Sequence, residues 1–318
     1  MSSARGSTRA SETRAGHRAG GCEGHGVPNR MHDDQVGIDG DIVRALIADQ
    51  HPRWADLPLV EVPSIGTVNA VYRLGDELCV RLPLKAGGVG SLERELERLP
   101  WLAARLPVAV PEPVATGAPD DAYPLPWAIY RWLPGTTADG SGGAALADDL
   151  AAAVTAIRAL DPTGAPRAGG RWTLAAWDPT VGRSLGALGG VIDVERAGAA
   201  WAAAVAAPPW DGPPTWVHGD LLAANLLVAD GRLAAVIDWG GAGTGDPAAD
   251  LLPAWSGLDA TGRVRLRTVL DPDDATWTRG QGWALRTALS GLPYYPETNP
   301  GFAAMAAAML AAVLADRD

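Results

Sequence analysis

The side chains most able to do chemistry are concentrated in residues 216–251, WVHGDLLAANLLVADGRLAAVIDWGGAGTGDPAADL. Asp220 precedes Asn225 by five positions, and Asp238 stands at the end of the next apolar run. A phosphoryl transfer needs hard oxygen ligands for Mg²⁺ and one carboxylate facing the acceptor hydroxyl. Asp220 and Asn225 have the spacing of a catalytic loop in which the aspartate receives the hydroxyl and the asparagine binds the metal.

These three residues need elements that hold them together. A strand-like run, Trp216-Val217-His218, leads into Asp220, and the runs NLLV and LAAVIDW flank the turn at residues 229–232. This turn between two apolar runs predicts a β-hairpin. The hairpin would bring Asp238 back beside Asn225, so that one carboxylate and one amide could share a metal ion.

The segment closely resembles the aminoglycoside phosphotransferase family and related antibiotic kinases. The family pattern is His-Gly-Asp, four residues, Asn, then Ile-Asp-Trp and Gly-Asp-Pro. Every element is present: His218-Gly219-Asp220, Asn225, Ile237-Asp238-Trp239, Gly245-Asp246-Pro247 and Asp250. The resemblance covers roughly residues 39–310. It implies an α+β, two-lobed, protein-kinase-like fold with a small antiparallel-sheet N-lobe and a mainly helical C-lobe.

The resemblance also implies a role for each residue of the pattern. Asp220 is then the catalytic base or the group that orients the hydroxyl, and Asn225 and Asp238 bind Mg²⁺. Three further residues are expected to support the loop and the segment after it: His218, Asp246 and Asp250. The alternative, in which Asp220, Asn225 and Asp238 are ordinary solvated loop and cap residues, does not account for their joint spacing.

The N-terminal half predicts the supporting elements. An acidic start followed by apolar residues at helical spacing predicts a helix over residues 39–49. Three β-like runs, 59–66, 69–75 and 77–84, are separated by turn residues and predict an antiparallel meander. A leucine stripe then predicts a helix over residues 91–106 despite a proline within it.

The third of these runs carries a cation. Cys79 and Arg81 share one face of the strand because side chains alternate between faces. In the family that this sequence resembles, a lysine is expected at this position to contact the phosphates. Arg81 replaces it here with a bulkier, forked group, whose contact geometry with phosphate oxygens differs. Lys85, the only lysine, is the alternative residue for contacting the phosphates, but it lies beyond Pro83, where the strand has ended. Alignment with the family selects Glu95 as the ion-pair partner of Arg81.

Two other regions are expected at the nucleotide. Residues 64–72, SIGTVNAVY, correspond to a loop over the phosphates, although Gly66 alone is present where a glycine-rich loop has several glycines. Residues 128–133 would form the hinge whose backbone binds adenine. Tyr130 and Trp132 are candidates to line that pocket, and core packing is the alternative for both aromatic side chains.

The organisation predicted from these patterns has three parts. Residues 1–36 are a disordered N-terminal extension, because they are rich in Arg, Gly and Ser and lack a signal-peptide core. Met31 is an alternative start of the chain. Residues 37–134 form the N-lobe, and residues 135–318 form the helical C-lobe with the catalytic loop and substrate site.

Composition restricts the partners. A net charge of −11 and a pI near 4.9 argue against nucleic acid and anionic membranes, and favour a cationic or neutral ligand. No apolar run reaches the roughly 18 to 20 residues of a membrane span. The two cysteines, Cys22 and Cys79, have no metal-ligand or redox spacing, which is typical of a reducing cytoplasm.

Several other functions fit these residues less well. A P-loop is excluded because Lys85 is followed by Ala86. Residues 182–186 match the G-x-S-x-G pattern of a serine hydrolase around Ser184, but no apolar strand leads into them. The scattered histidines do not support zinc. A pseudokinase that binds nucleotide without turnover remains the alternative to a Mg²⁺- and ATP-dependent kinase of a small hydroxylated molecule, an aminoglycoside or a metabolite alcohol. GTP in place of ATP and the oligomeric state are left open.

Overall fold

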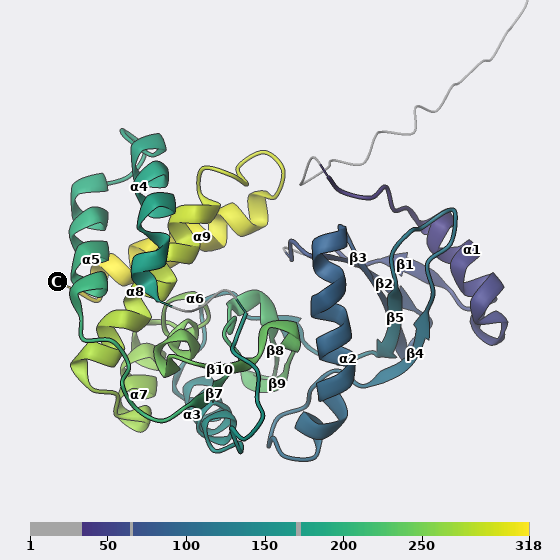
Figure 1. The fold of residues 1–318 in the computed structure, drawn as a ribbon, viewed down its shortest axis with the longest axis horizontal. Helices are drawn as coiled ribbons and strands as arrows, with labels where there is room; N and C mark the ends of the chain where they lie inside the picture. The colour runs from purple at the N-terminus through teal and green to yellow at the C-terminus, as the bar shows by residue number, and fades with distance from the viewer. Residues whose placement is uncertain (1–33, 64–65, 170–172, 318) are drawn as a thin grey trace, which may run out of the picture.

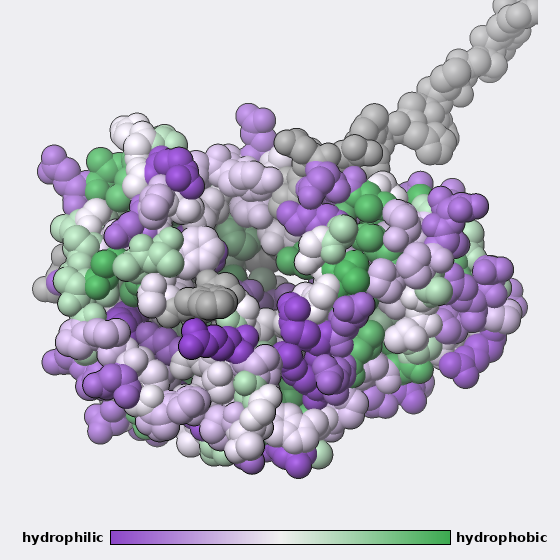
Figure 2. All heavy atoms as spheres, viewed as in Figure 1, coloured by the Kyte–Doolittle hydropathy of each residue, from purple (hydrophilic) through white to green (hydrophobic). Residues whose placement is uncertain are grey.

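The computed structural model describes residues 34–63, 66–169 and 173–317. The described chain forms the two lobes of a protein-kinase-like fold, with a sheet-containing N-lobe beside a larger helical C-lobe (Figure 1). The α+β fold class predicted from the sequence is confirmed. The space-filling view shows a hollow between the two lobes (Figure 2). None of the described helices is long and apolar enough to cross a membrane.

The predicted extension, residues 1–36, lies largely outside the described residues. Its last residue belongs to the folded N-lobe, because the Val36 N–H donates to the Leu84 carbonyl at 2.8 Å. The Val36 side chain also packs against the N-lobe core. The predicted extension is therefore too long at this end, whereas the lobe ranges 37–134 and 135–318 stay predictions.

The N-lobe sheet has five antiparallel strands in the order β1-β2-β3-β5-β4. Their bounds are β1 Leu59–Glu61, β2 Asn69–Leu74, β3 Leu78–Pro83, β4 Pro113–Gly117 and β5 Trp127–Arg131. The predicted meander of the first three strands is confirmed. β4 was not predicted, since it begins with proline and ends with glycine. Both residues are tolerated because β4 is an edge strand.

The two faces of this sheet pack against different helices. Val80 and Leu82 of β3 join a hydrophobic cluster with α1, Gly40–Gln50, on the outer face (Figure 1). Cys79, one position away, packs with the larger cluster that continues into the C-lobe. The alternation predicted for β3 therefore directs Cys79 and Arg81 to the face that carries α2, Val89–Ala103.

The C-lobe is built around α8, which packs against α5 and α9. Its helices are α3 Ala144–Arg158, α4 Asp178–Ala187, α5 Val194–Ala206, α6 Pro253–Ser256, α7 Ala260–Leu270, α8 Asp274–Gly291 and α9 Pro300–Ala315. Its short strands are β6 Thr136–Thr137, β7 Thr215–Val217, β8 Leu226–Ala229, β9 Arg232–Val236 and β10 Gly243–Gly245. Short 3-10 helices of the C-lobe span Leu174–Trp177, Ala223–Asn225, Trp239–Gly241 and Pro247–Leu251. Two others, Pro52–Trp54 and Ala86–Gly88, belong to the N-lobe.

The predicted hairpin is the β8–β9 pair. Its register joins Leu226 to Val236 at one end and Ala229 to Arg232 at the turn. The two turn residues, Asp230 and Gly231, have φ of 50° and 72°, the left-handed values that a tight two-residue hairpin requires. The hairpin prediction is confirmed, and it fixes where the chain emerges beyond β9.

The serine of the G-x-S-x-G match is not a nucleophile elbow. Ser184 lies inside α4 and is buried there, with no strand leading into it. A nucleophile elbow requires a sharp turn from a strand into a helix, with the serine exposed at its tip. The hydrolase alternative is therefore excluded by the position of Ser184.

Candidate active site

The candidate catalytic loop, residues 218–225, follows β7, which pairs with β10. Gly219 has φ of 79°, a left-handed conformation that glycine adopts without a side-chain penalty, and it turns the chain from His218 into Asp220. The Asn225 side-chain N–H donates to the Asp220 carbonyl at 2.8 Å and to its carboxylate Oδ2 at 3.3 Å. Because the amide nitrogen faces Asp220, the Asn225 Oδ1 is the atom available as an oxygen ligand.

Asp238 reaches the same loop through the β8–β9 hairpin. The Ile237 N–H donates to the Asn225 carbonyl at 3.0 Å, so the residue before Asp238 is fixed beside Asn225. Asp238 itself has φ of 66° and ψ of 61°. This left-handed conformation is one that aspartate and asparagine adopt more readily than other non-glycine residues. Hydrogen bonds thus join Asp220 to Asn225, and Asn225 to Ile237, so that Asp238 follows directly after the last residue of this network.

Arg81 connects the N-lobe sheet to this network. Its Nη1 donates to both carboxylate oxygens of Glu95 at 2.9 Å, and its Nη2 lies 3.3 Å from the Asp238 Oδ1. The neighbours of Glu95 on α2, Glu93 and Glu97, are exposed. The structure therefore brings together Arg81, Glu95 and Asp238, and Lys85 makes no ion pair with any described residue.

Burial affects both members of the Arg81–Glu95 pair. It raises the pKa of the Glu95 carboxyl, a shift that the adjacent guanidinium opposes. Burial also works against the charge of Arg81, but the carboxylates of Glu95 and Asp238 outweigh it and raise the pKa of Arg81. Glu95 also accepts a hydrogen bond from the Trp239 N–H at 3.3 Å. Arg81 therefore remains a fixed cation beside Asp238.

His218 braces the loop through both ring nitrogens. Its Nδ1 accepts the Asp220 N–H at 3.2 Å, and its Nε2 lies 3.1 Å from the Ile237 carbonyl. A carbonyl only accepts, so Nε2 carries the proton and the imidazole is neutral. The ring also packs edge-on against Trp239, with centroids 4.6 Å apart.

Asp250 holds the backbone of this loop, and Asp246 anchors the segment after it to α8. Asp250 is fully buried, and its two carboxylate oxygens accept the N–H groups of His218 and Gly219, each at 2.8 Å. Burial raises the pKa of Asp250, while the two hydrogen bonds from these backbone N–H groups oppose the shift. Asp246 forms a buried ion pair with Arg279 at 2.8 Å.

The residues predicted at the nucleotide base have mixed positions. Tyr130 is only 1% exposed and packs in the core, with the Arg81 guanidinium 5.4 Å from its ring centre. This burial matches the core-packing alternative. The Trp132 ring is half-buried beneath the Arg73 guanidinium at 4.9 Å. Gly66 lies in the β1–β2 loop, next to residues 64–65 outside the described range.

One contact between the lobes was missed by sequence reasoning. The Tyr295 phenol is hydrogen-bonded to the Thr67 side chain, so the α8–α9 loop meets the β1–β2 loop. No role follows from the sequence for the run LPYYPETNP, residues 292–300, that contains Tyr295. No local pattern pairs Thr67 with Tyr295, because they lie near opposite ends of the chain.

The oxygen atoms at the loop fit Mg²⁺. An asparagine oxygen and a carboxylate are the hard ligands that Mg²⁺ prefers, and nucleotide phosphates and water complete its octahedral shell in phosphotransferases. The part of the chain that the structure describes contains no group of three His, Cys, Asp or Glu side chains suited to a metal. Asn225 and Asp238 would hold Mg²⁺ together with the phosphates of a nucleotide.

Comparison with known proteins adds independent findings. Residues 60–289 match the model of the phosphotransferase enzyme family APH. An aminoglycoside 3'-phosphotransferase from Escherichia coli is 31% identical over 207 residues, which are 60% of this chain and 73% of that protein.

Solved structures extend the likeness to the whole fold. The GDP and kanamycin complex of APH(2")-IIia has a TM-score of 0.65 at 17% identity, covering 87% of this chain and 99% of that one. The apoenzyme of the macrolide 2'-phosphotransferase MphH from Brachybacterium faecium has a TM-score of 0.57 at 23% identity, covering 86% and 98%. At these identities the likeness establishes the fold alone.

Proposed function

Because the chain belongs to the phosphotransferase enzyme family, whose model it matches over residues 60–289, we propose that it transfers the γ-phosphoryl group of ATP to a hydroxyl of a small molecule. Mg²⁺ would accompany the nucleotide and neutralise charge on its phosphates. The observation that carries this proposal is the hydrogen-bond network that joins Asp220 to Asn225 and Asn225 to Ile237, which places Asp238 at the end of β9 beside the loop after β7.

Each residue of the network has a proposed task. Asp220 orients the acceptor hydroxyl and takes its proton. The Asn225 Oδ1 and the Asp238 carboxylate hold Mg²⁺. His218 and Asp250 keep Asp220 in place, because they fix the backbone on both sides of Gly219.

The N-lobe supplies the nucleotide contacts in this proposal. Arg81 is held by Glu95 on the sheet face toward the C-lobe, where its charge can reach phosphate oxygens. The loop that contains Gly66 covers the phosphates, and the chain around Tyr130 and Trp132 receives the base. Relatives of this fold have been solved with GDP and with ADP, so GTP and ATP are both phosphoryl donors to test.

The acceptor is proposed from chemistry and likeness together. A net charge of −11 favours a polycationic ligand through charge complementarity. The Escherichia coli relative is an aminoglycoside phosphotransferase, which makes an aminoglycoside the first candidate acceptor. The likeness to a macrolide phosphotransferase makes a macrolide hydroxyl the second candidate.

The test is turnover with a panel of acceptors. The full chain is incubated with Mg²⁺, ATP or GTP, and aminoglycosides, macrolides or metabolite alcohols, and nucleoside diphosphate release and the phosphorylated product are measured. At least one acceptor is expected to give a phosphate monoester. Asp220→Ala is expected to give none while it still binds ADP with Mg²⁺. Turnover by Asp220→Ala refutes the catalytic role, and nucleotide binding without turnover for any acceptor favours the pseudokinase.

A further inference from the structure

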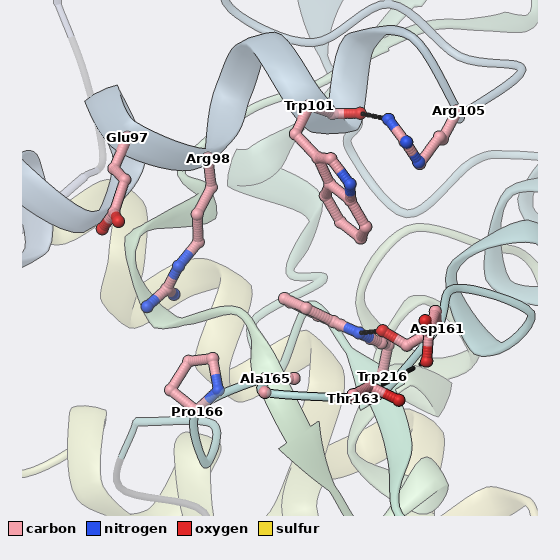
Figure 3. A pocket seen from close by; sticks show the side chains of 10 residues that line it. Glu97, Arg98, Trp101, Arg105, Asp161, Thr163, Ala165, Pro166 and Trp216 are labelled. Atoms are coloured by element: carbon pink, nitrogen blue, oxygen red, sulfur yellow. Dashed lines mark hydrogen bonds between the residues drawn. The ribbon is translucent and has the colours of Figure 1, made fainter.

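A cavity of about 580 Å³ lies between α2 and the C-lobe. Its N-lobe side is formed by Arg98, Trp101 and Arg105, and its C-lobe side by Trp216 and the turn at residues 161–166 (Figure 3). Its volume is within the range of small-molecule sites. Arg81, Asp220, Asn225 and Asp238 do not line it, so this interlobe cavity is separate from the proposed transfer site.

Two indole rings form an aromatic wall of the interlobe cavity. Trp101 points from α2 toward Trp216 of β7, and their ring centres are 5.4 Å apart at an angle of 34° (Figure 3). The Trp216 ring is held in place because its N–H donates to the Asp161 carbonyl at 2.8 Å. A fixed aromatic surface favours a flat apolar group, since stacking adds to the burial of area.

Two guanidinium groups lie on either side of Trp101 in Figure 3. Arg98 donates one N–H to the Ala242 carbonyl at 2.8 Å, and Arg105 donates one to the Trp101 carbonyl at 3.1 Å. Neither has an ion-pair partner among the described residues. Burial, followed by the nearby charge of Arg94, lowers the pKa of Arg98, which is what an unpaired, partly desolvated cation shows.

The two carboxylates at the cavity do not satisfy these cations. The Asp161 Oδ1 accepts the Thr163 N–H at 2.9 Å and so is engaged within its own turn. Glu97 is exposed, and no ion pair joins it to Arg98. The remaining N–H groups of Arg98 and Arg105 are therefore available to an anion, and guanidinium groups pair well with planar oxyanions.

We propose that the interlobe cavity is a second ligand site, which binds a planar aromatic anion with its acidic group at Arg98 and Arg105 and its ring against the Trp101–Trp216 pair. The ligand contacts both lobes from a position outside the nucleotide site. It therefore binds while nucleotide and Mg²⁺ occupy the transfer site. Ligand binding at this cavity does not depend on turnover, and only its compatibility with bound nucleotide rests on the proposed function.

The test uses three probes on the full chain, saturated with ADP and Mg²⁺. Naphthalene-2-sulfonate carries both features, 2-naphthalenemethanol has the ring without the charge, and methanesulfonate has the charge without the ring. Titration calorimetry is expected to give saturable binding of naphthalene-2-sulfonate, at least about tenfold tighter than either control, because each control loses one set of contacts. Absent binding, binding that ADP displaces, or equal affinity for 2-naphthalenemethanol overturns the proposal.

Matched variants locate the bound probe. Arg105→Gln and Trp101→Leu are each expected to weaken naphthalene-2-sulfonate binding about tenfold. Arg53→Gln is the control. The Arg105 guanidinium lies 4.8 Å from the centre of the Trp101 ring, and the Arg53 guanidinium lies 3.9 Å from that of the Trp54 ring but outside the cavity. Unchanged Tm and ADP affinity identify the folded variants. Equal probe affinity for folded Arg105→Gln and Arg53→Gln, or equal losses in both, contradicts the assigned site.

Discussion

Arg81 donates to both carboxylate oxygens of Glu95 at 2.9 Å, and this pair ties β3 to α2 on the face toward the C-lobe. Glu95→Gln keeps the shape but leaves the buried guanidinium facing a neutral amide. The free energy of unfolding is expected to fall by about 3 kcal/mol. The KM for nucleotide is expected to rise about tenfold as Arg81 loses its fixed position.

Urea denaturation and steady-state kinetics measure the two effects. Glu93→Gln is the matched control, because Glu93 is an exposed glutamate on the same helix. If Glu95→Gln and Glu93→Gln behave alike in both measurements, the Arg81–Glu95 pair has no part in stability or nucleotide binding.

Asp238→Asn tests the proposed metal site without disturbing the backbone. Asparagine tolerates the left-handed conformation of Asp238, whose φ is 66°, but it removes the negative charge. The Mg²⁺ concentration at half-maximal rate is expected to rise at least about tenfold, the scale of losing even a residue that only supports a ligand. Mg²⁺ titration of the rate measures this. Asp230 is also left-handed, with φ of 50°, but lies in the β8–β9 turn, so Asp230→Asn should leave the Mg²⁺ concentration at half-maximal rate unchanged. If the two variants need the same Mg²⁺ concentration, Asp238 is not a metal ligand.

Local patterns were sufficient for the elements around the loop. The β8–β9 hairpin follows from two apolar runs and a turn, and α2 follows from leucine periodicity. The same periodicity contains a signal for Glu95 that was not used. Leu92, Glu95, Leu99 and Leu102 are the buried residues of α2, and their spacing of three and four places Glu95 on the buried face. The choice among the glutamates therefore did not require a family resemblance.

Contacts between distant segments could not be predicted in this way. Trp101 meets Trp216, and Thr67 meets Tyr295, only because the two lobes approach each other. Likewise, the Asp316 carboxylate near the C-terminus accepts hydrogen bonds from the indoles of Trp255 and Trp277. Each such pair joins residues with no common periodicity, and their geometry depends on tertiary packing.

Asp250→Asn should affect the loop more than the fold. The carboxylate accepts from two backbone N–H groups, those of His218 and Gly219, whereas an amide has one oxygen and places an N–H against the second. The free energy of unfolding is expected to fall by about 2 kcal/mol. The kcat is expected to fall more than the KM for nucleotide changes, because the loop misplaces Asp220. Asp211→Asn, at an exposed aspartate, provides the control. If the KM for nucleotide rises by the same factor as kcat falls in Asp250→Asn, a positioning role for Asp250 is contradicted.

Alkaline pH should destabilise the N-lobe through Tyr72. Burial, helped by the carboxylates of Glu61 and Asp39, raises the pKa of Tyr72 to about 12. An unfolded chain has a tyrosine pKa of about 10, so the unfolded state loses this proton first as pH rises. The stability contribution is complete below about pH 10 and is lost as pH rises toward about 12.

The loss from Tyr72 is expected to be about 1 to 2 kcal/mol after screening by solvent. Tyr72→Phe removes the titrating group, so its Tm should decline less between about pH 9 and about pH 11 than that of the unaltered chain. Tyr294→Phe is the control, because Tyr294 is 52% exposed. Melting followed by circular dichroism, with tyrosinate absorbance recorded in parallel, makes the comparison. Identical declines for all three proteins would mean that the Tyr72 hydroxyl ionises equally in the folded and unfolded states.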